Sequence, residues 1–294
     1  METNRFVKSP LNYTGGKYKL LPQILPLFPK DIKVFYDVFM GGGDVFLNVD
    51  AEQIIATDIN APVVSLFNHM WYKVREKDNF TKFLLNYIDG EINRFGLSAS
   101  NKQAYLDYRK HFNDKDFNDL SKVFDLLIMV AHSFCNQIRF NQKGEFNLPF
   151  GKRTFNDKMK NNLINTIDRL KVQNVEFYVD DFELTIINLI EDSFNNDSKF
   201  VYLDPPYSCG CAQYNAGWDD KNDKRLLSCI DAIDHNGIKF ALSNVFENRG
   251  KKNDRLIEWC EKNNYVVHHL NNTYNNSSFR KSDNKTDEVL ITNY

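Results

Sequence analysis

The chain has 294 residues, of which 42% are hydrophobic, and its formal net charge is -2. This length and apolar content predict one large or two modest domains with an ample core. The near-neutral charge excludes binding of a polyanion through bulk basicity, so contact with nucleic acid would need a local basic patch. Five cysteines in no regular framework are typical of reduced intracellular thiols.

The N-terminal residues METNRFVKSP lack the apolar core of a signal peptide, and the longest apolar run, near Phe124–Ala131, is too short to span a bilayer. We therefore expect a cytoplasmic protein without a membrane partner. Cys209 and Cys211 lie close together, but no second pair of Cys or His has ligand spacing, so we expect no metal site.

A Gly-rich loop ends in Gly15-Gly16-Lys17 and precedes a predicted helix over 18–25. Backbone N–H groups freed by the glycines, with Lys17 at the start of the helix, would make an anion site. The spacing is not that of a phosphate-binding P-loop. An ordinary turn is the alternative interpretation.

A predicted strand over 34–38 runs into Gly41-Gly42-Gly43, which precede a predicted helix, and a second strand over 53–58 ends in Asp58. Glycines after the first strand of an α/β sheet let a ligand approach the backbone closely. An acid at the end of the second strand is placed to accept from ribose hydroxyls. Together they predict a nucleoside-bearing cofactor, with a plain βαβ unit and a capping Asp as the alternative.

From about residue 60 to 168 the pattern becomes helical, and no further βαβ unit is evident. Within this stretch, a loop or hairpin over 135–153 mixes amides and guanidinium groups with aromatics. Six basic residues stand against two acidic ones between Arg139 and Lys160. This is the local basic patch that DNA contact requires, although a charge run is also typical of a solvated surface.

After the helical stretch, strands and helices alternate again. Strands are predicted over 175–179, 200–203, 238–244, 265–270 and 288–294, with helices over 225–233 and 256–261. The pattern predicts one discontinuous α/β domain, residues 1–60 and 166–294, around a mostly helical insertion at 61–165. The Asn-rich stretch 271–284 is predicted to be a mobile loop.

The most informative stretch is Asp204-Pro205-Pro206-Tyr207, which follows a short buried strand. The prolines fix the backbone, so the Asp204 carboxylate and the Pro205 carbonyl can present two acceptors to one point. Such a pair suits an amino group with two hydrogens, and Tyr207 offers a face on which a base can stack. The alternative is a Pro-Pro turn that only ends the strand.

In this order, the loop ending in Gly15-Gly16-Lys17, the turn Phe39-Met40-Gly41-Gly42-Gly43, the acid of Thr57-Asp58-Ile59-Asn60 and the Asp204 element resemble the Dam family. Its members are DNA adenine-N6 methyltransferases of bacteria and their phages. The resemblance covers nearly the whole chain, including 146–151 and 287–291. It implies a Rossmann-like S-adenosylmethionine-dependent α/β fold with an inserted, mostly helical DNA-recognition domain.

The resemblance also implies roles for individual residues. S-adenosyl-L-methionine would be the cofactor, and its ribose would contact Asp58. The other implied cofactor residues are Tyr13, Gly16 and Lys17 in the first loop, Phe39, Gly41 and Gly43 in the glycine turn, and Asp181 and Phe182 near the adenine. The implied catalytic residues are Asp204, Pro205, Pro206 and Tyr207.

Duplex DNA is the implied partner. Arg139 matches a position that reads guanine in GATC-specific relatives, and Pro149 and Arg153 match further recognition positions. Gln137 stands where such relatives carry an apolar side chain, so the expected site is GATC or a related short sequence. The remaining predicted DNA-binding residues are Asn141, Lys143 and Lys152.

We therefore expect a site-specific DNA adenine-N6 methyltransferase that acts on a flipped base. The alternatives are a methyltransferase for another amino group, such as cytosine N4, an RNA adenine or a protein glutamine, and a non-catalytic DNA-binding regulator. The sequence leaves open the oligomeric state and whether a restriction nuclease accompanies the enzyme.

Overall fold

The computed structural model describes residues 6–116, 119–208, 218–271 and 286–294. The chain forms two compact units: a helical unit made of residues 1–16, 41–48 and 60–177, and a sheet unit made of 17–40, 49–59 and 178–294. The domain boundaries predicted at 60/61 and 165/166 stay a prediction. Cys209, Cys211 and the predicted mobile loop from residue 272 to 284 lie outside the described residues.

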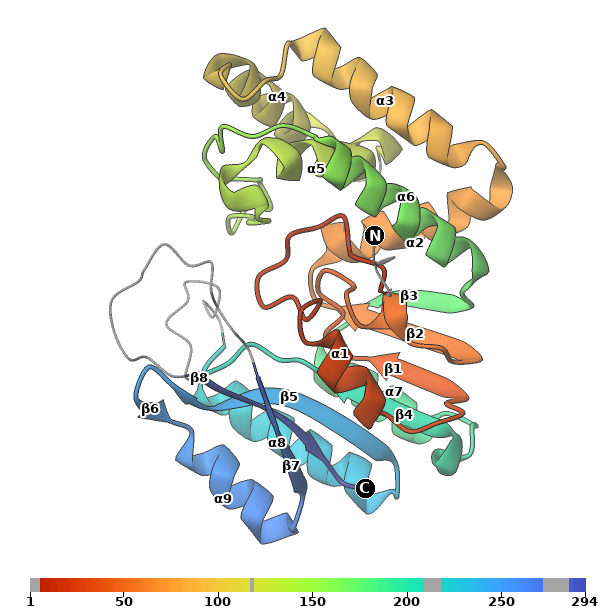
Figure 1. The fold of residues 1–294 in the computed structure, drawn as a ribbon, viewed down its shortest axis with the longest axis vertical. Helices are drawn as coiled ribbons and strands as arrows, with labels where there is room; N and C mark the ends of the chain where they lie inside the picture. Colours follow the sequence, from red (N-terminus) through yellow and green to blue (C-terminus); the bar gives the residue numbers. More distant parts are fainter. Residues whose placement is uncertain (1–5, 117–118, 209–217, 272–285) are drawn as a thin grey trace. The chain divides into compact units, whose positions relative to one another are not determined.

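The described strands form one mixed, mostly parallel sheet. They are β1 (Val34–Asp37), β2 (Gln53–Asp58), β3 (Val175–Val179), β4 (Lys199–Leu203), β5 (Lys239–Asn248), β6 (Lys251–Lys252), β7 (Val266–Leu270) and β8 (Thr286–Thr292). The strand order is β3-β2-β1-β4-β5-β8-β7, and β6 pairs with β5. β1 is parallel to β2 and β4, whereas β8 is antiparallel to β5 and β7 (Figure 1). The predicted α/β fold class is confirmed.

Helices flank the sheet. Those of the sheet unit are α1 (Leu21–Ile24), η1 (Leu25–Leu27), α7 (Phe182–Glu191), η4 (Asn196–Ser198), α8 (Asp220–His235) and α9 (Asp254–Asn263). Figure 1 shows α8 and α9 beside β5. The helix predicted over 18–25 begins only at Leu21 and continues as a 3-10 turn.

The prediction of a helix directly after the glycine turn was wrong. A single 3-10 turn, η2 (Phe46–Asn48), stands in its place. Gly41 and Gly43 have φ angles of 46° and 86°, outside the right-handed helical region. A chain that leaves the strand through these conformations therefore cannot enter a helix directly.

Alternate residues of β4 show how the sheet divides its core. Val201 and Leu203 belong to the apolar cluster that α7, α8 and α9 cover. Phe200 and Tyr202 point to the opposite face, where the Phe28 ring lies 4.8 and 5.6 Å from their ring centres. All five β4 residues are buried, as expected of a central parallel strand covered on both faces.

The helical unit contains α2 (Ala61–Glu76), α3 (Phe80–Phe95), α4 (Lys102–Asp114), α5 (Leu120–His132), η3 (Phe134–Asn136) and α6 (Asp157–Val172). Helix α5 is buried almost all round, as the central helix of a bundle must be. The helical pattern predicted for this part of the chain is therefore present.

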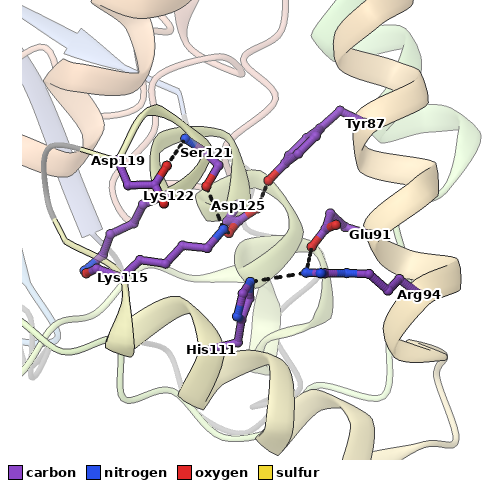
Figure 2. A network of polar contacts seen from close by, with 9 residues as sticks. All are labelled: Tyr87, Glu91, Arg94, His111, Lys115, Asp119, Ser121, Lys122 and Asp125. Atoms are coloured by element: carbon purple, nitrogen blue, oxygen red, sulfur yellow. Dashed lines mark hydrogen bonds and ion pairs between the residues drawn. The ribbon is translucent and has the colours of Figure 1, made fainter.

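A buried carboxylate forms polar contacts with several segments of the helical unit (Figure 2). Asp125 of α5 has a fully buried side chain and forms an ion pair with Lys115, whose side chain is 13% exposed. The Tyr87 hydroxyl of α3 donates to Asp125 at 2.6 Å. Burial and this hydrogen bond raise the pKa of the Tyr87 hydroxyl. The contact links three segments of the bundle through one charge.

We predict that Asp125→Ala lowers the free energy of unfolding by about 3–5 kcal/mol, because it leaves the Lys115 ammonium and the Tyr87 hydroxyl without their buried partner. Urea denaturation followed by circular dichroism measures this loss. Glu76→Ala is the control, since its ion pair with Lys73 lies at the solvent-exposed surface and should matter far less. Equal losses in the two variants would contradict the interpretation.

Candidate functional site

Three predicted site residues end neighbouring parallel strands. In register, Asp37 of β1 lies opposite Ala56 of β2 and Tyr202 of β4. The Val38 N–H donates to the Tyr202 carbonyl at 3.1 Å, so the ladder continues past the ends of the assigned strands. Two residues beyond the paired row come Phe39, Asp58 and Asp204. Because ligands of open α/β sheets bind at the carboxyl ends of strands, this row defines the candidate site.

Lys17 and Asp204 form an ion pair at this edge. The Lys17 Nζ lies 2.8 Å from Asp204 Oδ1, and the two side chains are 3% and 16% exposed. The Tyr207 hydroxyl donates to the same Oδ1 at 3.2 Å. The Lys17 ammonium also lies 5.2 Å from the centre of the Tyr207 ring. Two donors therefore hold one oxygen of Asp204.

The second oxygen of Asp204 has a different environment. Pro205 is buried, and Pro206 and Tyr207 are half-buried. Within the described part of the chain, no group donates a hydrogen bond to Asp204 Oδ2 or to the Pro205 carbonyl. These two acceptors therefore have no donor among the described residues, and their role toward an amino group stays a prediction.

Several charges set the proton affinity of Asp204. Burial raises the pKa of its carboxyl above the ordinary value, and the negative charge of buried Glu288 on β8 adds to the rise. The Lys17 ammonium and the Tyr207 hydroxyl act in the opposite direction, and burial has the larger effect. Lys17 thus stabilises the charged form of a carboxylate that its surroundings disfavour.

An aromatic cluster lies on the same side of the sheet unit. The rings of Phe39 and Phe182 are stacked with centres 5.6 Å apart. Trp218 packs against both, at 5.9 Å from Phe39 and 5.6 Å from Phe182. Its Nε1 donates to the Asp223 carboxylate at 2.7 Å, which fixes the indole. Phe39 and Phe182 were predicted, whereas Trp218 was not.

Arg225 of α8 fastens the start of α7. Its Nη2 donates to Asp181 Oδ1 at 2.8 Å, and its Nε donates to Glu183 Oε2 at 2.9 Å. The guanidinium lies 4.8 Å from the centre of the Phe182 ring. Asp181 also caps the helix by accepting from the Glu183 N–H at 3.0 Å. The predicted pair Asp181 and Phe182 is therefore held by a residue that the sequence pattern did not indicate.

The end of β2 exposes an apolar side chain beside an acid. Asp58 is only 9% exposed, whereas Ile59, the next residue, is 75% exposed. An isoleucine so exposed at the carboxyl end of a strand offers an apolar surface to a ligand next to a carboxylate acceptor. A nucleoside has groups that match this pair: its base can contact the apolar side chain, and its ribose hydroxyls can donate to the carboxylate.

The remaining predicted cofactor residues belong to the helical unit. A Cβ at Gly42 would lie 2.6 Å from the Cβ of Tyr13, and one at Gly16 would lie 2.7 Å from the Asp44 carboxylate. The Asn60 side-chain amide donates to the Tyr13 hydroxyl at 3.3 Å. Glycine is needed here because the Gly-rich loop and the glycine turn pack directly on each other.

Gly43 is needed for a second reason. Its φ is 86°, and a Cβ would lie 2.7 Å from the Phe46 ring and 2.9 Å from the Phe67 ring. Both the conformation and the packing therefore require glycine at this position. Gly41, with φ of 46°, shares the left-handed conformation.

The predicted DNA-contacting segment forms a hairpin, residues 133–150. Bridges pair Ser133 with Phe150 and Phe140 with Phe146. Asn141 organises the turn: its Oδ1 accepts from two backbone N–H groups at 2.9 Å, and its Nδ2 donates to Glu145 at 2.7 Å. The side chain of Asn141 is thus engaged within the hairpin.

Cations and an exposed proline line this hairpin and the residues after it. Arg139, Lys143, Pro149, Lys152 and Arg153 are exposed, and Gln137 is half-buried. In the part of the chain that the structure describes, no carboxylate forms an ion pair with these four cations. Arg153 donates to the Asn136 side chain at 3.0 Å. The positive charge is therefore available to phosphates.

No helix among the described residues has both the length and the apolar character to cross a bilayer. The same residues contain no group of three or more His, Cys, Asp or Glu side chains arranged to hold a metal ion.

The chain matches a protein family over most of its length. Residues 13–276 match the family of D12 class N6 adenine-specific DNA methyltransferases. The matched range includes every site residue discussed above except Glu288.

Individual relatives cover nearly all of the chain. Modification methylase StsI of Streptococcus sanguinis is 40% identical over 303 residues, which is 99% of this chain and 44% of the relative. Type II methyltransferase M.FokI of Planomicrobium okeanokoites is 39% identical and covers 100% of this chain and 44% of its own length. Type II methyltransferase M1.LlaDCHI of Lactococcus lactis subsp. cremoris is 26% identical, over 96% of this chain and 94% of the relative. The chain thus spans less than half of the first two relatives.

Proposed function

The chain belongs to the D12 class N6 adenine-specific DNA methyltransferases, and from this membership we propose that it transfers the methyl group of S-adenosyl-L-methionine to the N6 amine of an adenine in duplex DNA. The observation that best supports this reaction is the state of Asp204. Lys17 and Tyr207 hold Oδ1, and Oδ2 remains available beside the Pro205 carbonyl.

When bound, the cofactor supplies a methyl group activated by a positively charged sulfur. The described residues fit such a molecule. We assign the ribose to Asp58, whose neighbour Ile59 offers an apolar contact, and the adenine to the surroundings of Phe39, Phe182 and Asp181. Lys17 completes the cofactor residues that we propose for the sheet unit. Tyr13, Gly16, Gly41 and Gly43 of the helical unit stay cofactor residues predicted from the sequence.

The two acceptors address the weak nucleophilicity of an exocyclic amine. Its lone pair is delocalised into the ring, so the free amine attacks poorly. When Asp204 Oδ2 and the Pro205 carbonyl accept hydrogen bonds from its two N–H groups, they favour a tetrahedral nitrogen. They also stabilise the positive charge that develops on that nitrogen during attack. Because Lys17 and Tyr207 hold Oδ1, the carboxylate is oriented before the base arrives.

The target base must leave the helix to reach this pair. Flipping costs a few kcal/mol, and stacking on Tyr207 can return about 1–3 kcal/mol. The two contributions nearly offset each other. Alignment of the amine with the methyl group then provides most of the rate enhancement, for which effective-molarity effects of about 7–11 kcal/mol are an upper guide.

For DNA recognition we propose the hairpin 133–150 and the cations that follow it. Arg139 would read a guanine, and Lys143, Lys152 and Arg153 would contact phosphates or neighbouring bases. Gln137, Asn141 and Pro149 complete the proposed set, although Asn141 would act mainly by shaping the turn. The proposed target is GATC or a related short site, with Gln137 at the position that departs from the GATC pattern.

The names of the StsI and M.FokI relatives, a modification methylase and a type II methyltransferase, support a role in restriction-modification for this chain as well.

We predict that Asp204→Asn binds S-adenosylmethionine normally in calorimetry but transfers methyl groups about 10²–10³-fold more slowly, because the amide carries no charge to stabilise the developing cation. Labelled cofactor is offered to DNA, RNA and protein separately, and mass spectrometry identifies the modified base. Asp197→Asn, an exposed site in the same unit, is the control. Normal turnover in Asp204→Asn would remove the carboxylate from the mechanism, and labelling of RNA or protein alone would overturn the DNA assignment.

The pH dependence of turnover should report the Asp204 carboxyl. Activity needs its ionised form, so activity falls as the pH drops through its pKa, which burial raises. The acidic limb should therefore begin at a higher pH than for an ordinary Asp. Lys17→Gln removes the cation that lowers this pKa, so the limb should move to still higher pH.

The measurement is the pH profile of turnover at saturating cofactor and DNA. Lys19→Gln, an exposed lysine two residues away, should leave the limb in place. An acidic limb that stays or moves to lower pH in Lys17→Gln would show that Lys17 does not control the carboxyl.

Arg139 and Lys143 should have separable roles. Arg139→Ala should weaken discrimination at one base pair by about 1–3 kcal/mol, whereas Lys143→Ala should weaken binding to all DNA alike and reduce its salt dependence. Binding to cognate and random duplexes at several salt concentrations measures both effects. If Arg139→Ala weakened cognate and random binding equally, Arg139 would be a phosphate contact.

A further inference from the structure

Arg139 is held across the hairpin by a single residue. Its Nε donates to Asn147 Oδ1 at 2.7 Å, and its Nη2 donates to the Asn147 carbonyl at 3.2 Å. In return, the Asn147 N–H donates to the Arg139 carbonyl at 3.2 Å. Arg139 is nevertheless exposed. Three hydrogen bonds thus join the exposed Arg139 to the half-buried Asn147.

These bonds use one particular edge of the guanidinium. An arginine has five N–H groups, and it can grip a planar partner through the Nε and Nη2 edge or through the Nη1 and Nη2 edge. Asn147 occupies the first edge. The second edge keeps two parallel N–H groups, and among the described residues no acceptor engages Nη1.

Asn147 is itself fixed from both sides. Its neighbour Phe146 exchanges two hydrogen bonds with the Asn113 side chain of α4, at 2.9 and 3.2 Å. On the other side, the Leu148 carbonyl accepts from Tyr105 at 2.8 Å and from Arg109 at 3.0 Å. The returning arm of the hairpin is therefore anchored on α4, and Arg139 is held against that arm.

We propose that Asn147 is a specificity-determining positioning residue, which fixes Arg139 so that its Nη1 and Nη2 edge reads the O6 and N7 acceptors of one guanine in the major groove. This inference rests on the proposed function. Two parallel donors match that pair of acceptors. An arginine held in advance loses less rotamer entropy on binding and has less freedom to reach a phosphate or another base.

The test compares methylation of the cognate site with sites altered at each base pair in turn, for the unchanged chain, Asn147→Ala, Arg139→Ala and the double variant. We expect Asn147→Ala to reduce discrimination at one base pair by at least about fivefold. The affected base pair should be the one that Arg139→Ala affects. The double variant should lose no more than Arg139→Ala, because both changes remove one interaction.

Two further variants keep the inference falsifiable. Asn147→Asp retains the oxygen acceptor and should keep the discrimination ratio, in which any general loss of DNA affinity from the added charge cancels. Gln142→Ala, at the exposed tip of the same hairpin, should leave the discrimination ratio at each base pair unchanged. Thermal unfolding of each variant shows whether it is still folded. If Asn147→Ala is unfolded, the discrimination ratio is measured with Asn147→Asp instead.

Two results would overturn the role of Asn147: unchanged discrimination in Asn147→Ala, or a loss that adds to that of Arg139→Ala. A third result would make Asn147 a purely structural residue: Asn147→Ala weakens activity equally at every altered site and on random DNA. Site-selective methylation by the unchanged chain alongside any of these results leaves the proposed function standing. A chain that methylates no DNA overturns both.

Discussion

The ion pair between Lys17 and Asp204 is the contact on which the proposed chemistry of the sheet unit depends. It joins the end of the Gly-rich loop to the end of β4, and both side chains are largely buried. Buried ion pairs often contribute little net stability, because desolvation offsets the attraction. Its value here is electrostatic and geometric. Without the cation, a carboxyl whose pKa burial and Glu288 already raise would take up a proton more readily.

The same edge of the sheet carries a second, uncharged arrangement. Phe39 and Phe182 reach it from the ends of β1 and β3, and Trp218 closes the cluster. Arg225 holds the start of α7 through the carboxylates of Asp181 and Glu183 and through the contact of its guanidinium with the Phe182 ring. Because these ion pairs are partly exposed, their contribution to stability is small. Arg225 therefore matters chiefly through the orientation of Asp181 and Phe182.

The sequence contained the information for the strands and for the acids at their ends. Apolar runs such as 53–58 stop at an acid, and the carboxyl ends of parallel strands meet at one edge, so Asp58 and Asp204 could be placed together before any coordinates. The prediction of a helix after the glycine turn was wrong, because the periodicity of apolar residues does not indicate the backbone angles of Gly41 and Gly43. Residues such as Trp218, Arg225 and Asn147 act through partners distant along the chain or across a hairpin, and no local pattern marks them.

One physical device recurs at the two places where this chain is proposed to meet DNA. At Asp204, donors take Oδ1 and leave Oδ2 available. At Arg139, Asn147 takes the Nε edge and leaves the Nη1 edge available. Both groups are symmetric enough to bind a partner in more than one way, and in each case a neighbour already occupies the alternative. Selectivity then follows from which oxygen or which N–H edge is left to bind a partner. The conformational entropy of the side chain is lost on folding and not on binding.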